Sequence, residues 1–452
     1  MRYFGKAAAI AVLGFVSLAW PGGLAADELR VATFQSDITP PLGQPMISGD
    51  ALKTVEQPLL AKGIVLQAGA DRYVLCALDW CELCNGAHDR LQKQLAAAAG
   101  TEPARVALQC VHQHTAPLVD LDAQKLLAQA GVAGLQLDPQ VVAAIERKLV
   151  AAVKESVKHI EPFDHIGTGQ AKVERVAATR RPVGANGKIW VRYSSCKEAA
   201  LRALPEGAID PYLKTITLAE GEKPLVRLHY YATHPQSFYG DHRASSDVPG
   251  DAREALERKE GVFQIYFTGC GGDVTMGKYN DGSKPARREL AARLLAGMES
   301  AVAATKLAPA DAICWRTYPL RLPPRTDRGF TQAESLAVLN NPKAGPSRLY
   351  YGASHLAFIG RSQQPIVLSS LAIGNVHIVH LPGEPMVCFQ QFAQKLRPDA
   401  FVAVAGYGDG GTGYLCPAKA YGEGGYEPTA SRVKPESEAL LKKAIAALLE
   451  GE

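Results

Sequence analysis

The sequence predicts one large α/β domain in which mixed β-sheets are layered with helices. Short apolar segments with the two-residue period of strands alternate with longer segments of the 3.6-residue helical period. Several strand-like segments also follow one another without a helix between them, which indicates mixed rather than purely parallel sheets. With 452 residues and 47% hydrophobic composition, the chain has enough apolar side chains for a large core.

The predicted elements follow one another in order. Strand patterns lie at residues 29–35, 63–69, 73–80, 105–111, 212–220, 224–233, 262–269, 313–322, 365–374, 376–381 and 401–406. Helical patterns lie at residues 89–100, 138–158, 248–261, 284–305 and 433–451. We find no internal repeat in the sequence. The least regular stretch, residues 323–364, is expected to form a flap beside a site.

Residues 1–26 are expected to be a signal peptide. Arg2 and Lys6 supply positive charge, an apolar segment follows, and Gly23-Leu24-Ala25 provides small residues for cleavage. An uncleaved membrane anchor is the alternative, although the apolar segment is short for a membrane span. We therefore expect residues 27–452 to form an exported domain, periplasmic or secreted, with no transmembrane segment.

Charge and cysteine content exclude several classes of protein. The 49 basic and 45 acidic residues are balanced and form no basic patch, so no nucleic acid partner is expected. Nine cysteines do not make a dense disulfide framework in a chain of this length. Cys81 and Cys84 form a CxxC pair, which fits a local disulfide, two buried thiols, a redox pair or a zinc half-site. No second CxxC completes a structural zinc site.

Two histidines stand one residue apart where an apolar strand ends. His112 and His114 follow the strand pattern at 105–111, and their spacing places both side chains on one face of an extended chain. A strand end that faces a cavity can hold a metal ligand rigidly and still leave it accessible. Hydrogen-bonded histidines with a structural function are the alternative.

Three more polar side chains lie at similar boundaries. His234 follows the strand pattern at 224–233, where the chain enters a loop. Ser246 stands just before a predicted helix, and an ordinary helix N-cap is the alternative there. Glu384 lies in a Pro-Gly-Glu-Pro turn after a strand, and a surface turn is its alternative.

A glycine-rich segment near the C-terminus matches a dinucleotide-binding loop only in its spacing. Gly406, Gly408 and Gly411 fit G-x-G-x-x-G, but the residues that follow do not open a helix that could face a pyrophosphate. We interpret the segment as a loop whose backbone approaches a site, with Tyr414 and Tyr426 projecting from it. HExxH, GxSxG and Walker signatures are absent from the sequence.

Eight short motifs follow one another along residues 29–428. They are Asp37-Ile38-Thr39-Pro40, CVHQHTAP at 110–117, Thr179-Arg180-Arg181-Pro182, ATHPQS at 232–237, SDVPG at 246–250, Gly272-Asp273-Val274, Pro382-Gly383-Glu384-Pro385, and Gly413-Tyr414 with Tyr426-Glu427. In order and spacing they resemble the catalytic domain of the neutral, non-lysosomal ceramidase family.

The resemblance implies a zinc-dependent amidohydrolase, and together with the expected signal peptide it predicts an exported enzyme that cleaves an N-acyl amide bond with a zinc-activated water. One Zn²⁺ ion per chain is implied, since mixed nitrogen and oxygen donors suit zinc. The residues that match the family's zinc ligands are His112, His234, Glu384 and Tyr414. The residues that match its surrounding catalytic and substrate-contacting groups are His114, Ser246, Arg180 and Tyr426.

The resemblance also implies a role for each surrounding group. His114 would protonate the leaving amine, and Arg180 or Tyr426 would face the developing oxyanion. Ser246 would position the water or the carbonyl, with a covalent role as the alternative.

The chain departs from the family pattern at several points. Thr179 replaces an asparagine, the segment after Gly272-Asp273-Val274 differs, and the family's C-terminal β-sandwich domain is expected to be absent. The expected partner is therefore a small or lipid-like N-acyl substrate, and peripheral contact with a membrane stays open. Two alternatives remain: the same metal site acting on a non-sphingolipid amide or ester, and a non-catalytic exported binding protein.

Overall fold

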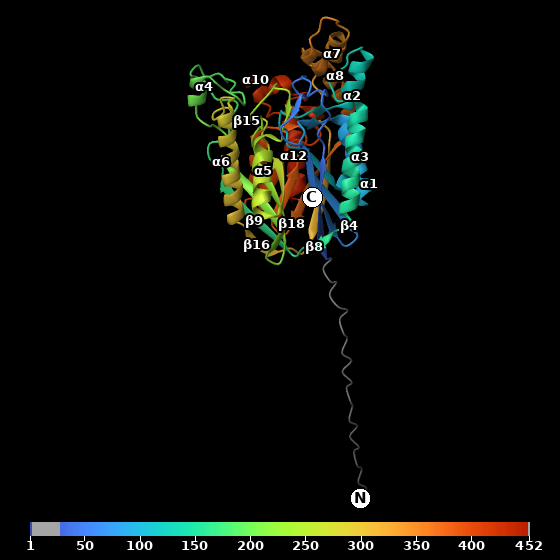
Figure 1. The fold of residues 1–452 in the computed structure, drawn as a ribbon, viewed down its shortest axis with the longest axis vertical. Coiled ribbons are helices and arrows are strands. Elements are labelled where there is room, and N and C mark those ends of the chain that lie inside the picture. The colour runs from blue at the N-terminus through green and yellow to red at the C-terminus, as the bar shows by residue number, and fades with distance from the viewer. Residues whose placement is uncertain (2–27, 451–452) are drawn as a thin grey trace.

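Three units with the same β-β-β-α-β-α topology make up the chain in a computed structural model, which describes Met1 and residues 28–450 (Figure 1). In each unit the first three strands pair antiparallel in chain order. A helix follows the third strand, and the fourth strand returns parallel to the third. A second helix completes the unit. The predicted α/β class with mixed sheets is confirmed, while the expected signal peptide lies outside the described residues.

The elements of the units are these. The first unit contains β1 (Leu29–Asp37), β3 (Leu60–Ala68), β4 (Asp71–Leu78), α1 (Asn85–Ala99), β6 (Val106–Cys110) and α3 (Pro139–Ser156). The second contains β9 (His165–Lys172), β11 (Tyr212–Glu220), β12 (Lys223–Tyr231), α5 (Asp247–Glu260), β14 (Phe263–Thr268) and α6 (Lys284–Ala303). The third contains β17 (Ile313–Leu320), β18 (Ile366–Ile373), β19 (Val376–His380), α9 (Val387–Leu396), β21 (Phe401–Ala405) and α12 (Ser437–Glu450).

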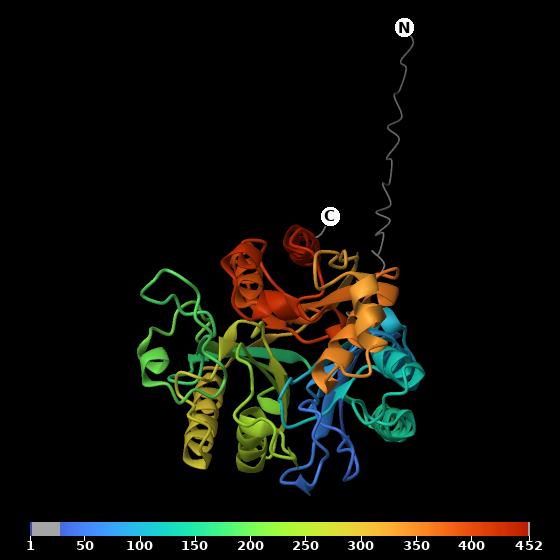
Figure 2. The same ribbon diagram turned by 90° about the horizontal axis from the view of Figure 1, so that it is seen from above.

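The three sheets pack their inner faces against one another, and helices cover their outer faces (Figure 2). Leu66, Ile216 and Leu371, one from each sheet, belong to a single apolar cluster. Separate clusters lie under α1 and α3 and under α9 and α12. Because successive strand side chains point to opposite faces, strands covered on both sides need apolar residues nearly throughout. Burying each such side chain contributes about 1.5–3 kcal/mol.

The threefold repetition of topology has no counterpart in the sequence. A buried strand position needs an apolar side chain of suitable volume rather than one particular residue, so the units can share a topology without sharing residues. The absence of a sequence repeat therefore did not indicate the absence of a structural one.

The predicted helices begin and end close to the expected residues because their caps are encoded locally. Asp138 accepts a hydrogen bond from the backbone N–H of Gln140 at the start of α3, and Ser283 does the same for Ala286 in α6. The helix α1 ends at Gly100, whose φ of 70° favours glycine. The helix α9 was not predicted, since it has only ten residues and no side-chain cap.

An insertion between β17 and β18 forms two helices, α7 (Gln332–Leu339) and α8 (Pro346–Arg361). A capping box of Thr331 and Glu334 starts α7. The stretch expected to be irregular is therefore largely helical, while α8 does line the cavity described below.

Shorter elements lie in the connections or at sheet edges. They are β2 (Thr54–Val55), β5 (Glu82–Leu83), η1 (Pro103–Arg105), β7 (Leu118–Val119), α2 (Leu121–Gln129), β8 (Glu161–Pro162), β10 (Ala178–Thr179), α4 (Ala199–Ala203), β13 (Arg243–Ala244), β15 (Val274–Thr275), β16 (Lys306–Pro309), β20 (Glu384–Pro385), η2 (Gly410–Thr412), β22 (Tyr414–Leu415), α10 (Ala420–Glu423) and α11 (Glu427–Ala430).

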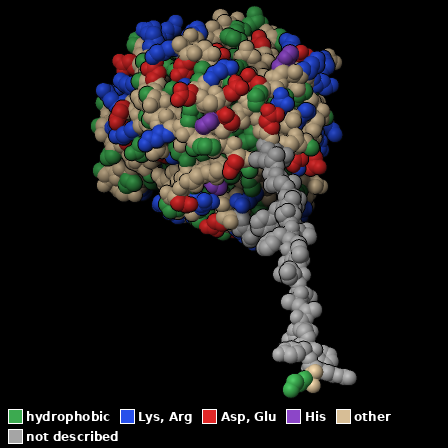
Figure 3. Space-filling view, turned by 90° about the horizontal axis from the view of Figure 1, so that it is seen from below, with side chains coloured by type: hydrophobic (Ala, Val, Ile, Leu, Met, Phe, Trp, Pro, Cys, Tyr) green, Lys and Arg blue, Asp and Glu red, His purple; other side chains and the backbone are tan. Residues whose placement is uncertain are grey.

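The surface seen from below in Figure 3 carries acidic and basic side chains interspersed with apolar ones. Within residues 28–450, none of the helices combines the length and the apolar character that a membrane span requires.

Candidate metal centre

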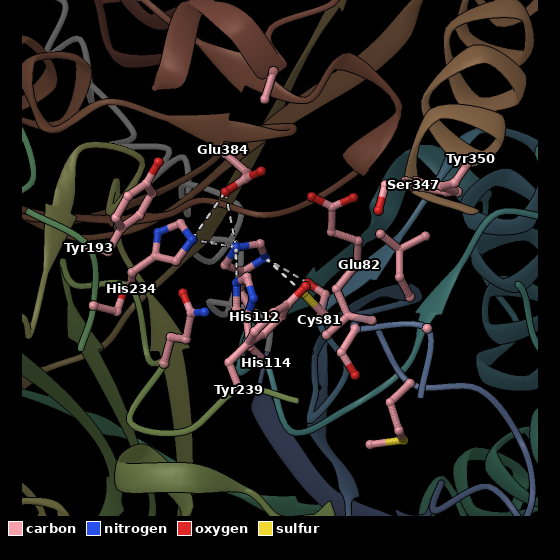
Figure 4. Close-up of a pocket in the computed structure, with 18 of the residues that line it drawn as sticks. Cys81, Glu82, His112, His114, Tyr193, His234, Tyr239, Ser347, Tyr350 and Glu384 are labelled. Atoms are coloured by element: carbon pink, nitrogen blue, oxygen red, sulfur yellow. Dashed lines mark hydrogen bonds and ion pairs between the residues drawn. The ribbon is translucent and has the colours of Figure 1, made fainter. Parts of the chain in front are cut away.

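Loops from all three units meet at a cavity of about 610 Å³ (Figure 4). His112 and His114 follow β6 of the first unit, and His234 follows β12 of the second. Glu384 and Tyr414 come from the third unit, after β19 and β21. All five side chains line the cavity.

The side chains predicted as metal ligands lie close together. The Nε2 atom of His112 is 2.9 Å from Nε2 of His234 and 3.0 Å from Oε2 of Glu384. The same carboxylate oxygen is 3.4 Å from Nε2 of His234. The Tyr414 hydroxyl is also 3.4 Å from that nitrogen. The four side chains come from distant parts of the chain, and the fold alone brings them together.

His112 itself has a left-handed backbone conformation, which turns the chain at this point. The strand β6 ends at Cys110, and His112 has a φ of 71°, so the chain leaves the extended conformation before it reaches His114. The two rings stand at 89° with their Nε2 atoms 3.3 Å apart. The pair thus meets through a turn, and not by sharing one face of a strand as predicted.

Backbone pairing sets Glu384 beside Tyr414. These residues lie opposite each other in the short parallel pair β20 and β22. Gly383, with a φ of 56°, precedes the carboxylate, and a Cβ atom there would collide with the Thr412 side chain and the Gly413 carbonyl. The constrained turn predicted around Glu384 is buried, and the alternative of a surface turn is wrong.

The hydrogen bonds of the two histidines fit a bound cation. Nδ1 of His112 donates to the Cys81 carbonyl at 2.8 Å, and Nδ1 of His234 donates to the Gly271 carbonyl at 3.1 Å. Because each Nδ1 carries its ring's hydrogen, the facing Nε2 atoms present lone pairs to each other and to Glu384. One additional proton would satisfy a single pair of these acceptors, whereas a metal ion would satisfy all of them.

Comparison with known proteins identifies the fold. No protein-family model matches the sequence, and no curated protein matches it. Two of the solved structures that are similar each share 16% sequence identity with this chain over 94% of its length. One is neutral ceramidase from Pseudomonas aeruginosa, with a TM-score of 0.68 over 75% of that chain. The other is a ceramidase complexed with C2, with a TM-score of 0.69 over 76% of that chain.

The chain has the ceramidase fold. The resemblance predicted from eight short motifs is thereby confirmed at the level of the fold, although most aligned residues differ.

Within the ceramidase fold of this chain, Arg180 and Tyr426 stand beside the cluster. Arg180 is buried and donates from Nη1 to the Tyr414 hydroxyl at 2.8 Å. Its guanidinium also lies 5.4 Å from the centre of the Tyr426 ring. Both side chains line the cavity, as the motifs predicted. A charged donor held here can stabilise negative charge on a nearby oxygen.

Burial controls the protonation of the cluster. Desolvation, together with the charges of His112 and Arg180, holds the pKa of His114 well below its usual value. Desolvation and the charge of Arg180 do the same to the pKa of His234. Burial would raise the pKa of Glu384, but His112 and Arg180 outweigh it and leave that pKa below the usual range. Desolvation keeps the pKa of Tyr414 well above 10 in the absence of a metal.

Ser246 is the predicted site residue that the ceramidase fold does not bring to the cavity. Its hydroxyl donates to Oε1 of Gln57 at 2.8 Å, and its side chain is not part of the cavity wall. Ser246 instead occupies the N-cap position of α5, the alternative that its sequence context offered, although its side chain makes no capping hydrogen bond.

Several side chains of the cavity were not predicted. Glu82 is 7% exposed and lines the cavity beside Glu384. Burial and the neighbouring Glu384 raise the pKa of Glu82 well above its usual value. Exposed Tyr193, Tyr239 and Tyr351 line the outer part. The position of Glu82 two residues after the predicted strand at 73–80 was the available signal, but Glu82 stands within the CxxC pair, which drew attention to the cysteines.

Cys81 and Cys84 are two buried free thiols in the structure. The Cys84 thiol donates to Oε2 of Glu82 at 3.4 Å, and the Cys81 sulfur lies 3.8 Å from Nδ1 of His112. Of the four alternatives left open by the sequence, two buried thiols is the one that the structure shows.

Proposed function

We propose that this protein is an exported, zinc-dependent amidohydrolase of ceramidase type that cleaves an N-acyl amide bond. The observation that carries the proposal is the convergence of two imidazole nitrogens and a carboxylate oxygen within 3.4 Å of one another, with both Nδ1 atoms already engaged. The similar structures, which are ceramidases, support the reaction class.

Zinc, held by His112, His234, Glu384 and Tyr414, would supply Lewis-acid activation of a water molecule and of the amide carbonyl. The donor set suits this ion, since zinc accepts imidazole nitrogen and carboxylate or phenol oxygen. The carbonyl groups of Cys81 and Gly271 would hold the two rings in the orientation that binding requires.

His114 transfers the proton in this proposal. Its ring stands next to the cluster, and its lowered pKa leaves it neutral and able to accept a proton from the attacking water. It would then deliver that proton to the leaving nitrogen. Its buried Nδ1 has no hydrogen-bond partner within the described part of the chain.

Arg180 acts on the side of the site where Tyr414 lies. It remains charged and fixes the Tyr414 oxygen through a 2.8 Å hydrogen bond. The positive charge beside the cavity favours the negative oxygen that develops on the attacked carbonyl. Tyr426, next to Tyr414 in the cavity wall, is positioned to contact the substrate.

Metal analysis and a substrate panel test the proposal. Purified protein is expected to contain about one zinc per chain and to release fatty acid or amine from at least one of a fluorescent ceramide, short N-acyl amides and matching esters. Glu384→Gln, which keeps the side-chain shape, is the matched variant and should lose both zinc and turnover. A zinc-free wild-type protein that binds these compounds without cleaving them would instead support the non-catalytic binding protein.

A further inference from the structure

A second cavity, of about 510 Å³, lies between the loop that follows His234 and the neighbouring helices α5 and α6 (Figure 1). We call it the basic cavity, because its wall contains four basic and two acidic side chains. These charged residues are Glu56, Arg243, Asp251, Lys284, Arg287 and Arg288. Phe238 lines both this cavity and the metal-centre cavity, so the two share part of their walls.

Arg287 forms the fixed inner part of the wall. Its side chain is 5% exposed, and Nη2 donates to Oγ of Ser245 at 2.6 Å. The guanidinium also lies 3.3 Å from the carboxylate of Asp251 and 3.5 Å from that of Glu56. A guanidinium with this many partners keeps one orientation, so the fold places a positive charge at a defined point of the cavity.

Arg243 is fixed in a similar way on the facing side. It belongs to β13, whose parallel pairing with β2 brings Glu56 beside it, and it forms ion pairs with Glu56 and Asp241. The Phe238 ring lies 4.8 Å from the guanidinium of Arg243 and 5.1 Å from that of Arg287. Both cations are therefore held against one aromatic ring as well as against carboxylates.

Lys284 and Arg288 leave the basic cavity with an excess of positive charge. Both lie in the first two turns of α6 at exposed positions, and neither takes part in an ion pair within residues 28–450. Burial opposes the ionisation of Glu56, but the surrounding cations, Lys284 among them, outweigh it and lower the pKa of that carboxyl. The cations come from separate segments of the chain, so no basic run in the sequence indicated them.

We propose that the basic cavity binds a phosphate group that carries two negative charges, either as free phosphate or as a phosphate monoester. A cavity lined mainly by one sign of charge concentrates ions of the opposite sign. Guanidinium groups match the spacing of phosphate oxygens, and an ammonium group adds a compact charge. Two negative charges match the two cations that lack an acidic partner, whereas a phosphodiester, with a single charge, would leave one of them unmatched.

Isothermal titration calorimetry with sodium phosphate at pH 8 tests the proposal. Wild-type protein should bind with a dissociation constant of about 1 mM or below. The double variant Lys284→Gln/Arg288→Gln should raise that constant at least about tenfold, because two charged contacts are lost. Its matched control is Arg147→Gln/Lys148→Gln, which removes one arginine and one lysine from exposed positions of α3 and should bind as wild type does.

Competing compounds identify the form of the anion. Sulfate, which also carries two charges, should displace phosphate, and dimethyl phosphate should bind at least about tenfold more weakly. Tighter binding of glycerol 3-phosphate than of phosphate would identify a monoester as the ligand, and equal or weaker binding would identify free phosphate. Either result supports the proposal, whereas binding only to phosphatidylglycerol vesicles would overturn it in favour of a membrane surface.

The outcome does not depend on the hydrolytic proposal. Zinc-loaded and metal-free protein should give the same dissociation constant, since none of the proposed metal ligands lines the basic cavity. Phosphate binding that requires zinc would place the anion at the metal centre and overturn the proposal. An unchanged affinity in Lys284→Gln/Arg288→Gln, or no phosphate binding by wild type, would overturn it as well.

Discussion

The three units of this fold place the same two loops around one cavity but equip them differently. After the third strand, the units present Glu82, His234 and Glu384 in turn. After the fourth strand, the first unit presents His112 and His114, and the third presents Tyr414. In the second unit this loop contributes the Gly271 carbonyl, which orients His234. The topology therefore fixes where a functional group stands, and the loop sequence decides what that group does.

The largest expected effect comes from removing any one of three metal donors, of which one lies in each unit. His112→Ala, His234→Ala and Glu384→Ala should each lose stoichiometric zinc and about 10³-fold or more of the hydrolytic activity, because a three-donor remnant binds zinc weakly. Plasma mass spectrometry and the hydrolysis assay measure both losses. Exposed His159→Ala serves as the control. A donor variant that keeps one tightly bound zinc per chain would break the idea of a site shared by the three units.

The loop after β6 carries two histidines with different proposed functions: His112 binds the metal, and His114 transfers a proton. His114→Ala should retain zinc while kcat falls by roughly 10²- to 10⁴-fold, which is the usual contribution of a general acid–base group. Zinc content and kcat measured on the same preparation decide the matter. Loss of the metal from His114→Ala would make His114 a ligand rather than a proton carrier.

The second unit should be sensitive to acid because of a histidine on its third strand. Burial lowers the pKa of His229 to about 4, so the unfolded chain binds a proton more readily than the folded one does. The stability that neutral His229 provides is present above pH 6.5 and is lost as the pH falls toward 4.

Between pH 7 and pH 5 this loss amounts to about 2 kcal/mol of unfolding free energy. Urea denaturation of metal-free protein at both pH values should show a smaller decrease for His229→Gln than for wild type. The exposed His159→Gln should match wild type, and an equal decrease in all three proteins would contradict the assignment to His229.

Ser246 gives the smallest expected effect on catalysis. Since its hydroxyl bonds to Gln57 outside the cavity wall, Ser246→Ala should keep kcat within about twofold of wild type and cost about 1 kcal/mol of stability. Steady-state kinetics and denaturation measure the two quantities. A loss of kcat comparable with that of His114→Ala would restore the catalytic role that the motif resemblance implied.

Local sequence information predicted the fold class and most of the helices and strands, since periodicity and caps act over a few residues. The same information, with the motif order, predicted that His112, His234, Glu384 and Tyr414 would matter. It did not reveal the repeated topology, because apolar strands satisfy the same burial with different residues. It misplaced Ser246 because an N-cap and a cavity residue look alike until the direction of the side chain is known. It passed over Glu82, whose burial depends on tertiary packing.

The separation between the packed sheets and the loops at their ends has a consequence for how such a protein diverges. Substitutions in the three loops leave the apolar clusters intact, so new chemistry can be tried at little risk to folding. Sequences can then drift to 16% identity while the architecture survives. Related chains with this scaffold should accordingly differ most in the compounds they accept, and least in how they fold.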